Sequence, residues 1–201
     1  MKKNLVVLFF LASTLLLKAA GYKTGDNAMD FSLKNIDGKM VSLKDYSTAK
    51  GFIIVFTCNH CPFAKAYESR IIDLDKKYAS KGFPVIAINP NDPVKEPADS
   101  YQNMVALAKE KQYPFPYLFD ESQQIATAYG AARTPHVYIV QKEQGKLVVK
   151  YIGAIDNNSD EPEMATEKYA ENALDALIQG KNVAVKETKA IGCTIKWKNP
   201  Q

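Results

Sequence analysis

A continuous apolar segment over residues 52–57 runs directly into Cys58-Asn59-His60-Cys61, and this junction restricts the possible folds most strongly. Such a segment is typical of a strand that is buried on both faces of a sheet. Apolar residues then recur every three or four positions from Phe63 to Tyr78, which predicts an amphipathic helix ending at Lys81-Gly82. A second apolar strand over residues 85–89 completes a βαβ unit, whose crossover connection requires parallel strands.

The rest of the chain predicts further strands and helices around this unit. Asp37-Gly38 marks the turn of an N-terminal hairpin within residues 28–46, and Gln144-Gly145 marks a second hairpin. The other expected elements are helices over 100–112, 121–129 and 163–179, a brief strand over 117–119, and hairpin strands over 136–141 and 147–152. Strands and helices that alternate in this order predict an α/β fold with a central mixed sheet.

The first twenty residues have the features of a secretory signal. Two lysines precede an apolar run from Leu5 to Leu17, and Ala19-Ala20 offers a small-residue cleavage site. The run is shorter than the roughly 20 residues that span a bilayer. We therefore expect a cleaved signal over residues 1–20 and one domain over 21–201, with 181–201 as a C-terminal extension. Localisation in the periplasm or cell envelope follows, where disulfides can form.

The charge distribution gives no sign of a basic surface for nucleic acid or for a membrane. The whole chain has a formal net charge of +4, and residues 1–20 contain three lysines and no acid, so the mature chain would carry +1. Lysine and glutamate are interleaved, which indicates an ordinary solvated surface. We expect no nucleic-acid partner, and a monomer or weak dimer.

The Cys58/Cys61 pair is the candidate catalytic centre. At a helix N-terminus, free N–H groups and the helix dipole favour a thiolate, so we expect a lowered pKa at the first cysteine. That cysteine would attack disulfides, and the second would resolve the mixed disulfide from one turn away. Asn59 and His60 are supporting residues, and His60 would add positive charge when protonated. No second Cys-x-x-Cys pair exists to complete a zinc site, and Pro62 follows the motif where a haem attachment site needs histidine.

The pattern of elements, with Cys-x-x-Cys at the first crossover, resembles the thioredoxin superfamily over about residues 28–179. Asp30-Phe31-Ser32-Leu33 and a helical insertion after Asn89 resemble its AhpC/TSA and TlpA/ResA-like branch. Phe56 to Phe63, together with Ile191 to Trp197, is most similar to the peroxiredoxin-like 1 group. The resemblance implies a thioredoxin fold with an N-terminal β-hairpin and a helical insertion.

The same resemblance implies that Thr134-Pro135 is a cis-proline loop facing the cysteines, with the Thr134 backbone free to pair with an extended substrate. The export signal and the cysteine pair at a strand-to-helix junction predict a thiol:disulfide oxidoreductase that exchanges with protein dithiols and disulfides. We expect no cofactor, because the sulfurs carry the electrons, and a membrane-bound thiol reductant as the electron source if the direction is reduction. The chain departs from the ResA-like pattern at Ala64, where those proteins have glutamate. Glu68 lies further along the helix and is expected to be solvated.

Two other functions stay open. In peroxiredoxins, a proline and a hydroxyl residue precede the peroxidatic cysteine, and neither Cys58 nor Cys61 has them. Cys61-Pro62 nevertheless matches the Cys-Pro of the peroxidatic site, and Arg133 could supply the basic group. A peroxiredoxin-like thiol peroxidase with Cys61 as peroxidatic cysteine is therefore the main alternative. A copper carrier using Cys58, Cys61 and His136 is a minor one, and we expect no metal site.

Cys193 has two interpretations. It could be a late-chain resolving thiol, as in two-cysteine peroxiredoxins, and so a third redox cysteine. We favour the other interpretation, in which it packs against Trp197, because small thiols are commonly buried.

Overall fold

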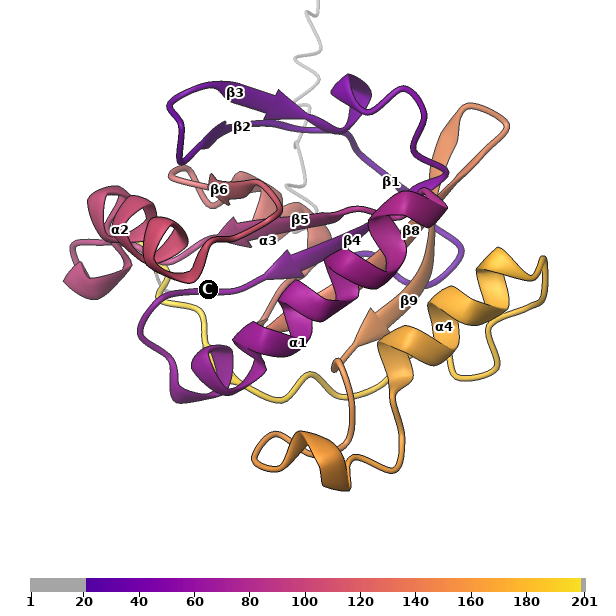
Figure 1. Cartoon of the computed structure of the whole chain (residues 1–201). Helices are drawn as coiled ribbons and strands as arrows, with labels where there is room; N and C mark the ends of the chain where they lie inside the picture. The colour runs from indigo at the N-terminus through magenta and orange to yellow at the C-terminus, as the bar shows by residue number, and fades with distance from the viewer. Residues whose placement is uncertain (1–20, 200–201) are drawn as a thin grey trace, which may run out of the picture.

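The computed structural model describes residues 21–199. Its main sheet has eight strands in the order β1-β9-β8-β4-β5-β6-β2-β3 (Figure 1). Their bounds are Asn27–Ala28 (β1), Ser32–Asn35 (β2), Met40–Ser42 (β3), Gly51–Phe56 (β4), Val85–Asn89 (β5), Tyr117–Phe119 (β6), His136–Glu143 (β8) and Lys146–Gly153 (β9). β4, β5 and β6 are parallel, whereas β8 is antiparallel to β4. The expected mixed sheet is confirmed, as are both hairpins.

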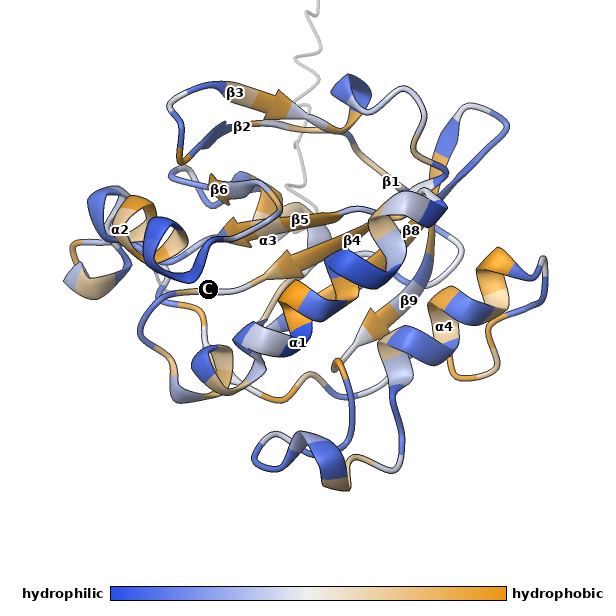
Figure 2. Cartoon of the chain, in the orientation of Figure 1, coloured by the Kyte–Doolittle hydropathy of each residue, from blue (hydrophilic) through white to orange (hydrophobic). Residues whose placement is uncertain are grey.

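Helices cover the two faces of this sheet. α1 (Pro62–Tyr78), α2 (Tyr101–Lys111) and α4 (Tyr169–Ile178) contribute to one hydrophobic core, and α3 (Gln124–Tyr129) contributes to the other (Figure 1). Alternate residues of β4 divide between the cores: Ile53 and Val55 face α1, while Ile54 and Phe56 face α3. This explains the continuous apolar strand in the sequence, because both faces are buried. The central strands are accordingly the most hydrophobic part of the chain (Figure 2).

The C-terminal segment forms a structure that the sequence did not predict. β10 (Cys193–Thr194) pairs antiparallel with β7 (Arg133–Thr134), in the register Cys193 opposite Thr134. Beyond β10, Ile195 is buried and Trp197 packs against the core on the α3 side. The segment after residue 180 therefore returns across the molecule to the end of β4, where α1 begins.

Two element boundaries differ from those expected. The last helix, α4, begins at Tyr169 and not near residue 163. The Asn157 side chain accepts a hydrogen bond from Glu167 N and donates one to the Thr166 hydroxyl, and these bonds hold the preceding loop in a non-helical conformation. α3 begins at Gln124 rather than at residue 121. The end of α1 is as expected: a short 3-10 turn, Ala79–Lys81, stops at Gly82, whose φ of 96° favours glycine.

The expected signal, residues 1–20, lies outside the described residues, and the division of the chain into signal and domain stays a prediction. Within residues 21–199, no helix has the length and apolar character needed to cross a membrane.

Candidate redox site

The three cysteines meet where β4 ends and α1 begins. Cys61 is the N-cap residue of α1, and Pro62 occupies the first helical position, where the missing N–H costs nothing. A disulfide joins Cys61 to Cys193 on β10, with the two Cα atoms 6.1 Å apart. Cys58 is a free thiol that is only 5% exposed. The favoured packing of Cys193 against Trp197 is therefore wrong: Cys193 is covalently paired, because the C-terminal strand brings it to the motif.

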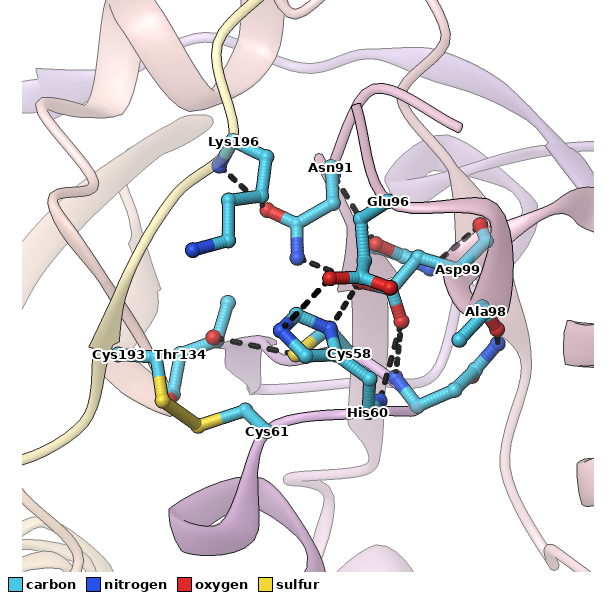
Figure 3. A network of polar contacts seen from close by, with 12 residues as sticks. Cys58, His60, Cys61, Asn91, Glu96, Ala98, Asp99, Thr134, Cys193 and Lys196 are labelled. Atoms are coloured by element: carbon cyan, nitrogen blue, oxygen red, sulfur yellow. Dashed lines mark hydrogen bonds and ion pairs between the residues drawn. A yellow bond between two sulfur atoms is a disulfide. The ribbon is translucent and has the colours of Figure 1, made fainter. Parts of the chain in front are cut away.

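Thr134 contacts both cysteines of the motif. Its hydroxyl lies 3.2 Å from Cys58 Sγ, and its carbonyl oxygen lies 3.3 Å from Cys61 Sγ (Figure 3). The Thr134-Pro135 bond is cis, as the resemblance implied. The Thr134 backbone is not free, however, because β10 occupies this edge. Arg133 also serves the C-terminal strand, since its guanidinium donates to the carbonyl of Gly192 at 3.1 Å.

Asp99 holds the motif loop in place, and sequence reasoning missed it. Its fully buried carboxylate accepts from the backbone N–H groups of Asn59 and His60, at 2.7 and 3.2 Å, and contacts His60 Nδ1 at 2.6 Å (Figure 3). Asn91 donates to the same carboxylate at 2.6 Å. The signal was present in the sequence, because Asn91 and Asp99 follow the carboxyl end of a parallel strand, at the sheet edge where Cys58 also lies.

Asn59 and His60 are both held by neighbouring residues. The Asn59 side chain donates to the Ala98 carbonyl at 2.9 Å and accepts from the Tyr117 hydroxyl at 2.8 Å. The second ring nitrogen of His60 lies 3.5 Å from the carboxylate of Glu96. The His60 ring therefore faces a carboxylate at each nitrogen. Both residues are thus fixed by the segment before α2 and by β6.

The environment of Cys58 contradicts the expected lowering of its pKa. Burial, and then the nearby Asp99 carboxylate, raise the pKa of Cys58 to about 11, against a smaller opposing effect from the Thr134 hydroxyl. Desolvation and a like charge both disfavour the thiolate, and here they exceed the effect of the helix N-terminus. In this state, with Cys61 bonded to Cys193, Cys58 is held as the neutral thiol.

A small cavity adjoins Cys58 on the α1 side. Its volume is about 10 Å³, close to the space of one water, and its lining includes Cys58, Ala64, Glu68 and Tyr113. Glu68 is not freely solvated as expected, because its carboxylate accepts from the Tyr113 hydroxyl at 2.9 Å. It lies one turn beyond Ala64 on the same face of α1. An acidic group is therefore present beside Cys58, although not at the position that ResA-like proteins use.

His136 and Cys61, two of the three expected copper ligands, are already engaged in this state of the protein. His136 Nδ1 accepts from Ala132 N at 3.3 Å, burial lowers the pKa of His136 to about 4, and Cys61 is bonded to Cys193. Among residues 21–199, the potential metal ligands that lie close enough together are Cys58, His60 and Asp99. All three groups already have partners: the Asp99 oxygens make four contacts of hydrogen-bond length with Asn59, His60 and Asn91, and Cys58 contacts the Thr134 hydroxyl.

The match to a family model decides the identity. The model described as the AhpC/TSA family matches residues 24–150. The chain belongs to this family. The predicted branch of the thioredoxin superfamily and the predicted fold class are thereby confirmed, and the finer placement in the peroxiredoxin-like 1 group stays a prediction.

Individual AhpC/TSA relatives agree with this assignment. A crystal structure of an uncharacterized conserved protein from Geobacillus kaustophilus is 40% identical, with a TM-score of 0.81, and covers 89% of this chain and 94% of that chain. The thiol-disulfide oxidoreductase ResA of Bacillus thuringiensis is 26% identical over 166 residues, 76% of this chain and 91% of ResA. Peroxidoxin BcpB of Mycobacterium tuberculosis, at 18% identity and a TM-score of 0.58, covers 79% of this chain and 97% of BcpB and shows the fold alone. These findings confirm the predicted enzyme class, a thioredoxin-like oxidoreductase.

Proposed function

We propose that this AhpC/TSA protein is an exported thiol:disulfide oxidoreductase that exchanges disulfides with other proteins. One observation carries the proposal: a free thiol, Cys58, and a disulfide, Cys61–Cys193, lie together against Thr134 at the start of α1. Thiol–disulfide exchange requires these two groups and no cofactor, since the sulfurs carry the electrons. The similarity to ResA, a thiol-disulfide oxidoreductase by name, supports the same reaction class.

In this proposal Cys58 is the nucleophile and Cys61 resolves the mixed disulfide. Asn59, His60 and Asp99 hold the motif loop, and Thr134-Pro135 positions the sulfurs. The partners are protein dithiols and disulfides, with a membrane-bound thiol reductant as electron source for reduction. The periplasm or cell envelope fits this chemistry, because disulfides persist there.

Insulin reduction tests the proposal. The protein should accelerate dithiothreitol-dependent precipitation of insulin, and Cys58→Ser should abolish the acceleration. Thr194→Val, an exposed change on β10, is the matched control and should retain it. Equal turnover by Cys58→Ser would refute the assignment of the nucleophile.

A thiol peroxidase is the second candidate, and the Cys61–Cys193 disulfide favours it. A peroxidatic cysteine is oxidised to a sulfenic acid, which a resolving thiol converts to a disulfide with loss of water. Cys61 and Cys193 could take these two roles. Hydrogen peroxide consumption that depends on both Cys61 and Cys193, but not on Cys58, would favour this candidate over the first.

A further inference from the structure

The C-terminal strand occupies the edge of the fold at which a protein substrate would dock. β10 pairs antiparallel with β7, and Cys193 lies opposite Thr134. An extended peptide that adds to a free strand edge makes this same kind of pairing. Cys193 therefore lies where the cysteine of a bound substrate would lie, but its disulfide partner is Cys61, the resolving cysteine, and the nucleophile Cys58 stays free.

From this arrangement we infer that the C-terminal strand is an internal substrate of the site. Cys58 attacks Cys61, the Cys61–Cys193 bond breaks, and β10 leaves the β7 edge for an extended, cysteine-bearing segment of another protein. This inference rests on the proposed function and adds Cys193 as a third redox residue.

The exchange balances within the chain. The Cys58–Cys61 bond forms as the Cys61–Cys193 bond breaks, and the proton lost by Cys58 ends on Cys193. One disulfide is present before and after the step, so no external oxidant or reductant is needed. The buried sulfurs are Cys58 and Cys61, at 5% and 0% exposure, whereas Cys193 is more exposed. The step therefore moves the free thiol from a buried residue to a partly exposed one.

The rate of this step depends on two opposing factors. With its pKa raised to about 11, Cys58 is ionised in only about one molecule in ten thousand at pH 7. Well-oriented intramolecular reactions reach effective molarities on the order of 10⁵ M, which offsets this scarcity. An external disulfide has no such advantage. The docked tail therefore favours internal exchange over attack on a substrate.

One hydrogen-bond network links the motif loop to the tail. Asn91 donates to Asp99, which holds the backbone of Asn59 and His60, and the side-chain Oδ1 of Asn91 accepts from Lys196 N at 2.8 Å (Figure 3). Asp92 N donates to the Lys196 carbonyl at 2.9 Å. The motif loop and the tail are thus held by the same buried side chains, those of Asn91 and Asp99.

The contacts of the tail describe the segment that could replace it. A Cβ at Gly192 would lie 2.2 Å from the Thr134 carbonyl oxygen, so the residue before the cysteine must be glycine. Two residues after the cysteine, Ile195 is 4% exposed in the core on the α3 side. The substrate class is therefore an extended segment with the pattern glycine, cysteine, any residue, aliphatic residue.

Alkylation of the oxidised protein tests the internal exchange without any substitution. N-ethylmaleimide is added at pH 8, the reaction is stopped with acid, and the disulfides are mapped by mass spectrometry of unreduced peptides. The inference predicts label on Cys193 together with a Cys58–Cys61 disulfide. Label on Cys58 with Cys61–Cys193 intact would overturn it, and so would an unlabelled protein. Oxidised Cys58→Ser should take up no label.

A second experiment displaces the tail by steric conflict. In Gly192→Val, the new side chain meets Thr134, so Trp197, the only tryptophan, should become solvated and its emission should shift to the red. Thr194→Val places the same side chain at the neighbouring exposed position and should keep the tail docked. Gly192→Val should also bind a peptide copy of residues 188–198 with Cys193→Ser at least tenfold more tightly than the wild type does. Equal emission and equal binding would overturn the inference.

These outcomes separate the inference from the proposed function. If insulin is reduced but the label remains on Cys58, the function stands and the internal exchange fails. If the label moves to Cys193 but no variant reduces insulin, the exchange stands and protein substrates are excluded.

Discussion

A single carboxylate, that of Asp99, determines the geometry of the motif loop. It is fully buried and accepts from two backbone N–H groups of the Cys58–Cys61 segment. A buried charge is tolerated only when it is hydrogen-bonded in this way. The same charge lies close enough to Cys58 to disfavour its thiolate. Asp99 therefore both orders the site and keeps the free thiol in its neutral form.

The first prediction concerns the ionisation of Cys58. In the oxidised protein Cys58 is the one free thiol, and Cys193 becomes available to the label only after the Cys58 thiolate has attacked Cys61. At saturating N-ethylmaleimide every exchange is trapped, so the rate of labelling should rise tenfold per pH unit from pH 7 towards about 11. Asp99→Asn removes the charge that helps to raise this pKa, and the curve should move to lower pH. The other groups facing Cys58 are His60, Glu68, Tyr113 and Tyr117, and they are unchanged in this comparison.

Asp73→Asn is the control for Asp99→Asn, because it removes the same charge from the exposed face of α1. It should leave the alkylation curve in place. A midpoint near 8.5 in the wild type, or identical curves for Asp99→Asn and the wild type, would contradict the assigned causes.

At the scale of elements, the spacing of apolar residues predicted the helices and strands that depend on local sequence alone. The βαβ unit and both hairpins follow from apolar spacing and turn residues. The start of α4 could not be predicted, because side-chain bonds from Asn157 stop the helix from extending towards residue 163. β10 could not be predicted either, since a two-residue strand has no period, and its partner lies about sixty residues earlier in the sequence.

The second prediction concerns the docking of β10. The buried Gln123 side chain donates to the Lys196 carbonyl and accepts from Lys198 N, each at 2.8 Å. Gln123→Ala removes both bonds, each contributing roughly 1 kcal/mol, so the tail should hold Cys193 near Cys61 less firmly. In glutathione buffers, the total of about 2 kcal/mol should move the equilibrium about thirtyfold towards the reduced thiols, equivalent to about 45 mV.

Gln124→Ala, at the adjacent exposed position, should leave the glutathione equilibrium unchanged. If the two variants gave the same equilibrium constant, the tail contacts would have no influence on the disulfide.

At the scale of the whole molecule, the disulfide joins the start of α1 to the end of the chain. The two cysteines are 132 residues apart, so the bond restricts most of the unfolded chain. Closing a loop of this length corresponds to about 5 kcal/mol in the chain-entropy model, and measured values are typically lower. The disulfide that we propose as a reacting group therefore also constrains the unfolded chain.

The third prediction follows from this loop. Reduction, or Cys193→Ser, should lower the free energy of unfolding in urea by about 2–5 kcal/mol. Cys58→Ser keeps the disulfide and should stay within about 1 kcal/mol of the wild type. Equal stability of the oxidised and reduced protein would show that the tail is not held in the folded state.

The last prediction concerns the stability of the whole molecule in acid. Burial lowers the pKa of His136 from 6.5 to about 4, so the folded state favours the neutral ring. The stability that this gives is fully present above pH 6.5 and is lost as the pH falls towards 4, a change of about 3 kcal/mol. The buried Asp75 and Asp120, whose pKa values burial raises, act in the opposite direction in every variant. Urea unfolding at pH 7 and pH 4 should therefore show a smaller loss in His136→Asn than in the wild type, even if the substitution lowers stability at both pH values. Parallel losses would show that His136 does not resist protonation in the folded state.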